Sequence, residues 1–204
     1  MTEAPAKTLV LASASSARAR LLRAAGVPLR VVPTDLPEAE LRDALRAAGS
    51  GPGEAAARLA DAKALALAGR VAPDDLVLGA DQILEFEGEW LEKCPDLGAA
   101  AALLRRLRGR THRLWTAAVL VRGEIPLWRH VETVELRMRA FSDAFLAEYL
   151  ERSGASILSA VGAYRLEECG VQLFSRIQGD YFSILGLPLL PLLEALRQQR
   201  LLEP

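Results

Sequence analysis

The 204-residue sequence predicts an α/β fold with a mixed sheet. Hydrophobic residues make up 51% of the chain, enough apolar surface to offset the entropy of ordering it. Buried-strand patterns alternate with amphipathic helix patterns in the first half, whereas strand patterns follow one another directly later. No Ser/Gly-rich or Pro-rich linker interrupts the sequence, so residues 1–204 are expected to form a single domain.

The N-terminal half contains the alternating elements. Three short apolar runs are typical of buried strands: residues 9–12, 27–32 and 76–80, the last running into Asp81. Two helices are expected between them: one with Leu21, Leu22 and Ala25 inward and ending before Gly26, and one over residues 53–67.

The C-terminal half favours locally paired strands. A small hairpin turning near Gly88 is expected over residues 83–90, and a strand pair over 112–121 and 125–139. Three helices are also expected: residues 96–107 with Gly109 just beyond, a helix through Leu150 with Ser142 as its N-cap, and a last helix from about 187 to about 200.

Charge and composition exclude several classes of protein. The chain has 25 Lys and Arg against 26 Asp and Glu, a net charge of −1, so a nucleic acid polymer is not an expected partner. The basic residues 105–113 lie at a predicted helix C-terminus, where the helix dipole favours cations. The N-terminus does not resemble a signal peptide, and no stretch approaches the ~20 apolar residues of a membrane span. Cys94 and Cys169 lack metal-ligand spacing, and a cytoplasmic location is expected.

The loop after the first strand is a candidate phosphate site. Residues 13–16 are small and mostly hydroxylated, and they lead into a helix that carries Arg18 and Arg20. Free backbone N–H groups, hydroxyls and guanidinium groups are the donors that bind phosphate. The alternative is that these serines only cap the helix. No P-loop or dinucleotide-binding glycine motif is present.

Acidic and lysine residues supply two further candidates. Asp81 is expected at the end of an apolar strand, where it could bind Mg²⁺ or accept a proton from water, although Asp is also common in turns. Only three of the 25 cations are lysines, and two of these, Lys63 and Lys93, lie far from the N-terminus in sequence. Their retention in an Arg-rich sequence suggests a need for compact point charges.

Motifs along almost the whole chain resemble those of the Maf family of nucleoside triphosphate pyrophosphatases. They are LVLASASSARARLL (9–22), VVPTDLPE (31–38), the A-x-x-K-A pattern (60–64), VLGADQ (77–82), the hairpin G-E-x-x-x-K (88–93), GRTH (109–112), GAYRLEECG (162–170) and RIQGDYFSILGLPL (176–189). Each motif alone is weak, but their shared order makes the resemblance specific.

The resemblance implies a Maf/ITPase-like fold, with an elongated mixed sheet, flanking helices and a cleft between two lobes. It implies hydrolysis of the α–β phosphoanhydride of a small-molecule nucleotide, assisted by a divalent metal such as Mg or Mn. Asp81 matches the family's proton acceptor, and Glu38 an acid that joins Asp81 in holding the metal. The residues matching the family's triphosphate contacts are Ser13, Arg18, Lys63 and Lys93. A homodimer is among the arrangements that the resemblance implies.

Several positions depart from the family pattern, and three bear on base preference. Ser16 and Ala17 replace the Pro and first Arg of the SxSPRR loop, Cys94 replaces a Pro, and Ser183 replaces an Asn. Gln82 and Glu167 match the branch that prefers 7-methyl-GTP, and a carboxylate can accept hydrogen bonds from guanine N1–H and its amine. Ala17 lacks the aromatic ring common in that branch, so guanine-type selectivity is a hypothesis.

A non-catalytic function is the alternative. Members of the family carry the name of septum formation inhibitors, which makes a nucleotide-binding regulator of cell division a second candidate. Retention of Asp81, Lys63 and Lys93 favours the enzyme.

Overall fold

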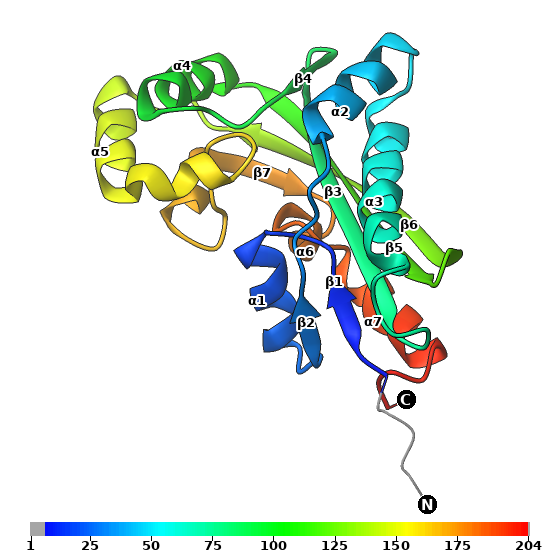
Figure 1. Cartoon of the computed structure of the whole chain (residues 1–204). Coiled ribbons are helices and arrows are strands. Elements are labelled where there is room, and N and C mark those ends of the chain that lie inside the picture. The colour runs from blue at the N-terminus through cyan, green and yellow to red at the C-terminus, as the bar shows by residue number, and fades with distance from the viewer. Residues whose placement is uncertain (1–6, 204) are drawn as a thin grey trace, which may run out of the picture.

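Seven strands form one mixed sheet in the computed structural model, which describes residues 7–203 (Figure 1). Their order is β2-β1-β3-β5-β6-β7, with β4 paired to β3 outside this path. The strands are Leu9–Leu11 (β1), Leu29–Val31 (β2), Leu76–Phe86 (β3), Glu89–Leu91 (β4), Thr111–Arg122 (β5), Ile125–Met138 (β6) and Phe174–Gln178 (β7). β1 is parallel to β2 and β3, and the other pairs are antiparallel. The prediction of a mixed α/β fold is confirmed.

Helices flank the sheet. They are Ser16–Ala24 (α1), Glu38–Ala47 (α2), Pro52–Ala68 (α3), Leu97–Leu107 (α4), Asp143–Ser153 (α5), Tyr181–Ile184 (α6) and Leu189–Gln198 (α7), with 3₁₀ turns at Gly154–Ser159 (η1) and Cys169–Leu173 (η2). The side chains of Ser15, Asp96, Ser142 and Asp180 each accept a hydrogen bond from a backbone N–H of the helix that follows. The predicted N-cap at Ser142 is therefore confirmed.

Two parts of the fold lack a counterpart in the predicted elements. No helix was expected over α2, which has only two large apolar residues, Leu41 and Leu45, one turn apart at the margin of the α3 core, and no fully buried residue. Its acidic first turn and the Arg46 in its last turn still suit a helix dipole. β7 and α6 are also unpredicted, and with five and four residues they are too short to show a period.

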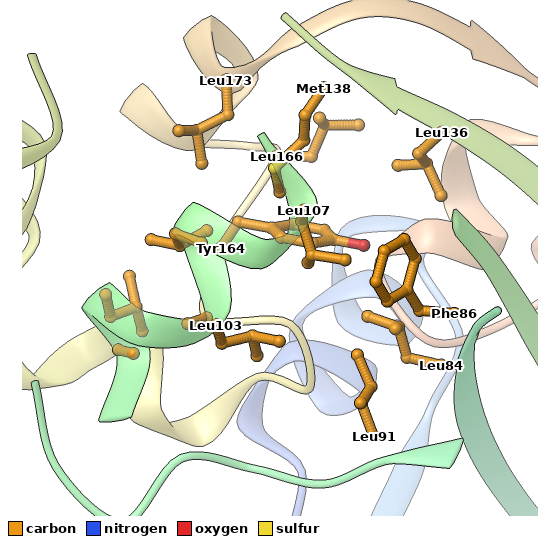
Figure 2. Packing of buried hydrophobic residues seen from close by; sticks show 14 of the residues in the cluster. Leu84, Phe86, Leu91, Leu103, Leu107, Leu136, Met138, Tyr164, Leu166 and Leu173 are labelled. Atoms are coloured by element: carbon orange, nitrogen blue, oxygen red, sulfur yellow. The ribbon is translucent and has the colours of Figure 1, made fainter. Parts of the chain in front are cut away.

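Alternate residues of β3 face different apolar layers. Val77 and Ile83 pack with the buried face of α3 on one side of the sheet. On the other side, Leu78 belongs to a cluster built with α1 and α7. Farther along that same side, Leu84 and Phe86 belong to a third cluster built with α4 and α5 (Figure 2). This side of the sheet therefore carries two separate apolar cores along the length of β3.

One edge of β3 is interrupted between those two cores. β1 pairs with residues 76–78 of β3, and β4 pairs with residues 84–86. Residues 79–83 have a strand neighbour only on the β5 side. The sheet thus leaves room beside the middle of β3, where the carboxyl end of β1 stops.

Gly79 allows α3 to approach this part of β3 closely. A Cβ atom at residue 79 would lie 2.0 Å from the backbone oxygen of Ala60 on α3. Only glycine fits such a contact. The close approach brings the next turn of α3, which carries Lys63, beside β3.

Cys94 and Cys169 are both free thiols, and burial together with the charge of Asp96 raises the pKa of the Cys94 thiol.

Among the described residues, no helix combines the length and apolar character needed to cross a bilayer.

Candidate active site

A cleft of about 480 Å³ opens beside the interrupted edge of β3. Its walls come from the β1–α1 loop, the start of α2, the segment after β4, and residues 159–167 and 184–186. All nine residues that the sequence singled out line this one cleft: Ser13, Ala17, Arg18, Glu38, Lys63, Asp81, Gln82, Lys93 and Glu167. Positions up to 154 residues apart in sequence are thereby brought into one site.

Lys63 lies between two carboxylates in the cleft. Its Nζ is 2.5 Å from Oδ1 of Asp81 and 2.8 Å from Oε2 of Glu38. The side chains of Lys63 and Asp81 are each 6% exposed, whereas that of Glu38 is 38% exposed. The ammonium of Lys63 therefore fixes the position of Asp81, and its ion pair with Glu38 connects the start of α2 to α3.

The second oxygen of Asp81 has no such partner. Oδ2 is buried and makes no hydrogen bond within residues 7–203. A buried acceptor without a partner is costly, so this atom is poised to bind a proton donor or a cation that enters the cleft. It is the one site carboxylate oxygen that combines full burial with a free acceptor in the described part of the chain.

The expected position of Asp81 at a strand end is wrong. β3 continues through Asp81 to Phe86, so the residue lies in the middle of the strand. The neighbouring parallel strand β1 does end here, with Leu11 opposite Leu78. Asp81 borders the cleft because the neighbouring strand stops, a feature that a single apolar run cannot reveal.

The β1–α1 loop both caps the helix and faces the cleft. Oγ of Ser15 accepts from the backbone N–H of Arg18, as an N-cap does. Oγ of Ser13 accepts from Nη1 of Arg18 at 3.2 Å, and Nε of Arg18 donates to the carbonyl of Gly186 at 2.9 Å. These contacts fix the guanidinium at the cleft.

Asp81 and Glu38 also act on Arg18 through their charge. Burial lowers the pKa of Arg18, and the two carboxylates oppose that shift. A guanidinium stays protonated at neutral pH in such a setting, so it supplies a fixed positive charge.

Two further cations line the cleft, one in the segment after β4 and one on α2. Lys93 is exposed and makes no ion pair within the described residues, so its ammonium is available to a ligand. Arg42 also lines the cleft, with its Nη1 3.3 Å from Oε1 of Glu92. Sequence reasoning did not find Arg42, because the helix that presents it was itself unpredicted.

Glu167 adds an acidic group to the cleft lining. Oε1 of Glu167 accepts from Arg20 and from Arg165, each at 3.1 Å. Ala17 adds no ring here, and the one aromatic residue lining the cleft, Tyr164, is buried with its hydroxyl 2.9 Å from Nε2 of His112. Glu167 can therefore offer an acceptor oxygen to a ligand, and among the described residues no exposed aromatic ring lines the cleft.

The basic segment 105–113 does not form a free cationic patch. Five of its arginines lie within 4 Å of carboxylates: Arg105, Arg106, Arg108, Arg110 and Arg113. Their charge is therefore balanced locally by neighbouring carboxylates.

The fold and the cleft together describe an α/β protein whose cleft carries groups able to bind a phosphorylated ligand. Its lining combines cations such as Arg18 and Lys93, the hydroxyls of the β1–α1 loop, the buried acid Asp81 and the acceptor oxygens of Glu167. This is the set of groups that binds a polyanion next to a group capable of proton transfer.

Comparisons with known proteins identify the family. Residues 8–199 match the family described as Maf-like protein. A nucleoside triphosphate pyrophosphatase from Granulibacter bethesdensis is 50% identical over 194 residues, which are 95% of this chain and 98% of that protein. A 7-methyl-GTP pyrophosphatase from Rhizobium meliloti is 45% identical over 190 residues, covering 93% and 95%. The chain therefore belongs to the Maf family, as the motifs indicate.

A search of solved structures found a HAM1 protein from Coxiella burnetii. It has a TM-score of 0.42 and 16% identity, over 66% of this chain and 74% of that one.

Proposed function

We propose that this protein hydrolyses the α–β phosphoanhydride of modified or noncanonical nucleoside triphosphates, giving a nucleoside monophosphate and pyrophosphate. Relatives with 44–50% identity over nearly their whole length carry the name nucleoside triphosphate pyrophosphatase. The observation that carries the proposal for this chain is Asp81, which is buried in the cleft with Oδ1 fixed by Lys63 and Oδ2 free.

Asp81 would act on the attacking water. Oδ2 accepts one proton of the water as its oxygen bonds to the α-phosphorus, and the bond from that phosphorus to the pyrophosphate oxygen breaks. The ion pair with Lys63 holds the carboxylate in one orientation. Because Asp81 is then already oriented, little reorganisation is needed when the water is bound.

Cations around the cleft would bind the triphosphate. Arg18, held by Ser13 and Gly186, and the unpaired Lys93 can contact phosphate oxygens from different walls. As the leaving pyrophosphate gains charge, these groups stabilise it. The charge of Lys63 is shared with Glu38 and Asp81, so its larger effect is on the position of the acid.

A divalent cation, Mg or Mn, is part of the proposal, and the residues present fit one. Within the described residues no group of three or more His, Cys, Asp or Glu could hold a metal ion. Mg²⁺ does not need so many protein ligands, because it is usually bound by one or two carboxylates together with substrate phosphates. Asp81 and Glu38 supply two carboxylates at the cleft. When bound, such an ion neutralises phosphate charge.

Gln82 and Glu167 would determine the base. Both line the cleft, and Oε2 of Glu167 makes no hydrogen bond within the described residues. Acceptors at these positions suit the adjacent N–H donors of guanine. We therefore propose that the preferred substrate carries a guanine-type base, and that 7-methyl-GTP is among these substrates.

Asp81→Asn tests the activity. Pyrophosphate release from 7-methyl-GTP, GTP, UTP and dTTP is measured with Mg²⁺ or Mn²⁺ and after chelation. The enzyme predicts loss of turnover by about 10²–10⁴-fold with the fold intact, as for loss of a general base. A wild type that binds nucleotides without turning any over would instead favour the regulatory function, and a preference for the pyrimidines would overturn the base assignment.

A further inference from the structure

The side-chain amide of Gln82 is held in one orientation. Its Nε2 donates to Oγ1 of Thr116 at 2.8 Å and to the carbonyl oxygen of Ser183 at 2.9 Å, with the carbonyl oxygen of Ile184 3.3 Å away. Backbone carbonyls only accept hydrogen bonds, so the amide nitrogen must face them. The flipped amide would place Oε1 against two carbonyl oxygens, a repulsive arrangement.

Oε1 of Gln82 is consequently left for a ligand. It makes no hydrogen bond within residues 7–203, and it is not among the buried side-chain atoms without a partner. Since Gln82 lines the cleft, this oxygen is an acceptor that a nucleotide can reach. The cleft therefore meets the base with an acceptor here and never with the amide donor.

Thr116 is central to this arrangement. It lies directly opposite Gln82 in the β3–β5 register and is fully buried. Oγ1 donates its only proton to the carbonyl of Ser183 at 2.9 Å, so only lone pairs face Gln82. Asp180 fixes Ser183 in turn, accepting from its N–H at 2.7 Å and its hydroxyl at 2.6 Å.

An apolar residue would be expected at position 116, because its neighbours on this side of β5 belong to apolar cores. Along this side of β5, Leu114 belongs to the core of α4 and α5, and Ala118 to the core of α1 and α7. The hydroxyl between them lies at the junction of two apolar cores. A buried polar network is costly unless every member is satisfied, and here Thr116 and Ser183 are.

We propose that Thr116 is a positioning residue for base selection. It accepts from the Gln82 amide and holds the Ser183 carbonyl that the same amide faces, so that Oε1 is left to face the nucleobase. This acceptor, with the free oxygen of Glu167, selects a base with two adjacent N–H donors. Guanine presents such a pair, whereas uracil presents one N–H between two carbonyls. This role rests on the proposed function and adds the residue that sets the polarity of the reading group.

Thr116→Val tests the proposal, because valine has nearly the same shape and no hydroxyl. kcat and KM for GTP, 7-methyl-GTP and UTP are compared with the wild type, and dissociation constants for the same nucleotides are measured by calorimetry. We expect the preference for guanine nucleotides over UTP to fall about tenfold, mainly through KM, as for loss of one oriented hydrogen bond. Thr116→Ser, which keeps the hydroxyl, should restore the preference.

The Gln82→Ala background separates positioning from packing. There, Thr116→Val should change the ratio of guanine to uracil affinity no further, because the amide that it positions is absent. An equal loss for all nucleotides, or a further change of the ratio in that background, would overturn the proposal. If Thr116→Val does not fold, Asp180→Asn loosens Ser183 from a partly exposed site, and an unchanged ratio would also overturn it.

The two proposals fail differently. If the wild-type protein turns over none of the nucleotides, the proposed hydrolase activity is contradicted. The binding ratios would still decide the role of Thr116.

Discussion

Nζ of Lys63 lies 2.5 Å from Oδ1 of Asp81 in the interior of the protein, on the side of β3 that α3 covers. The carboxylate of Glu38 approaches the same ammonium from α2. Lys63 engages only one oxygen of the buried Asp81, and Oδ2 has no hydrogen-bond partner within the described residues, which is unfavourable in a buried place unless a cation or proton donor joins it. The cleft is thus prepared for a cationic or proton-donating ligand at Oδ2 of Asp81.

Removing the ammonium should be strongly destabilising. Lys63→Met leaves the buried Asp81 without its partner, and we expect the free energy of unfolding to fall by about 3–5 kcal/mol. In the double variant with Asp81→Asn the unpaired charge is gone, so part of that loss should be recovered. Urea unfolding of the wild type, both single variants and the double variant measures the coupling; strictly additive effects would contradict a direct ion pair.

Gly79→Ala should separate α3 from β3. The added Cβ would lie 2.0 Å from the backbone oxygen of Ala60, and backbone cannot move aside as a flexible side chain can. We expect a loss of more than about 3 kcal/mol in stability, at the upper end of overpacking effects, together with lower turnover because Lys63 moves with α3.

Gly69→Ala is the matched control for that substitution. Gly69 follows the last turn of the same helix, with φ −82°, and has nothing within 4 Å of an added Cβ. Its stability should stay within about 0.5 kcal/mol of the wild type or rise slightly. Thermal unfolding compares the two, and similar melting temperatures for both variants would show that the contact at residue 79 is not close.

Arg18→Lys should weaken substrate binding. The guanidinium reaches Ser13 and Gly186 with two different nitrogens, and one ammonium cannot replace that fork. We expect kcat/KM to fall about 10–100-fold, chiefly through KM. Arg23→Lys, an exposed change on the same helix, serves as the control and should leave kinetics unchanged. Equal kinetics for the two variants would remove Arg18 from the site.

Much of the site could be predicted because its motifs are local. The 13–18 loop and residues 79–82 each carry their candidate residues within a few positions, and the structure places these residues in the lining of one cleft. The contacts that orient these residues are not local. Thr116 reaches Gln82 across the sheet, and Gly186 reaches Arg18 from 168 positions away.

Two features of the fold show why the remainder escaped prediction. A period-based argument needs a run of large apolar residues, and α2 offers only Leu41 and Leu45, so Arg42 was not placed at the cleft. The apolar run at 76–80 predicts a strand that ends before Asp81, but β3 continues because β5 pairs with it as far as Glu85. Pairing partners, which lie far away in sequence, decide where strands end.

His112 should make the fold sensitive to acid. Its side chain is 2% exposed, with Nε2 2.9 Å from the hydroxyl of Tyr164 and Nδ1 unpartnered within the described residues, and burial lowers its pKa to about 4. The unfolded chain takes up a proton near pH 6.5, while the folded protein resists it until about pH 4. Lowering the pH through this window therefore favours unfolding, by roughly 3 kcal/mol at its lower end.

His112→Gln removes this titration and keeps a side chain that can hydrogen-bond to Tyr164. Above pH 6.5 the histidine is neutral in both states, so there the two proteins should differ by an amount that does not depend on pH. Below it, the stability of the wild type should fall more steeply until about pH 4, where the difference levels off. Urea unfolding at intervals from pH 8 to pH 4 gives both curves. Curves that stay parallel throughout would mean that His112 is protonated in the folded protein as easily as in the unfolded chain.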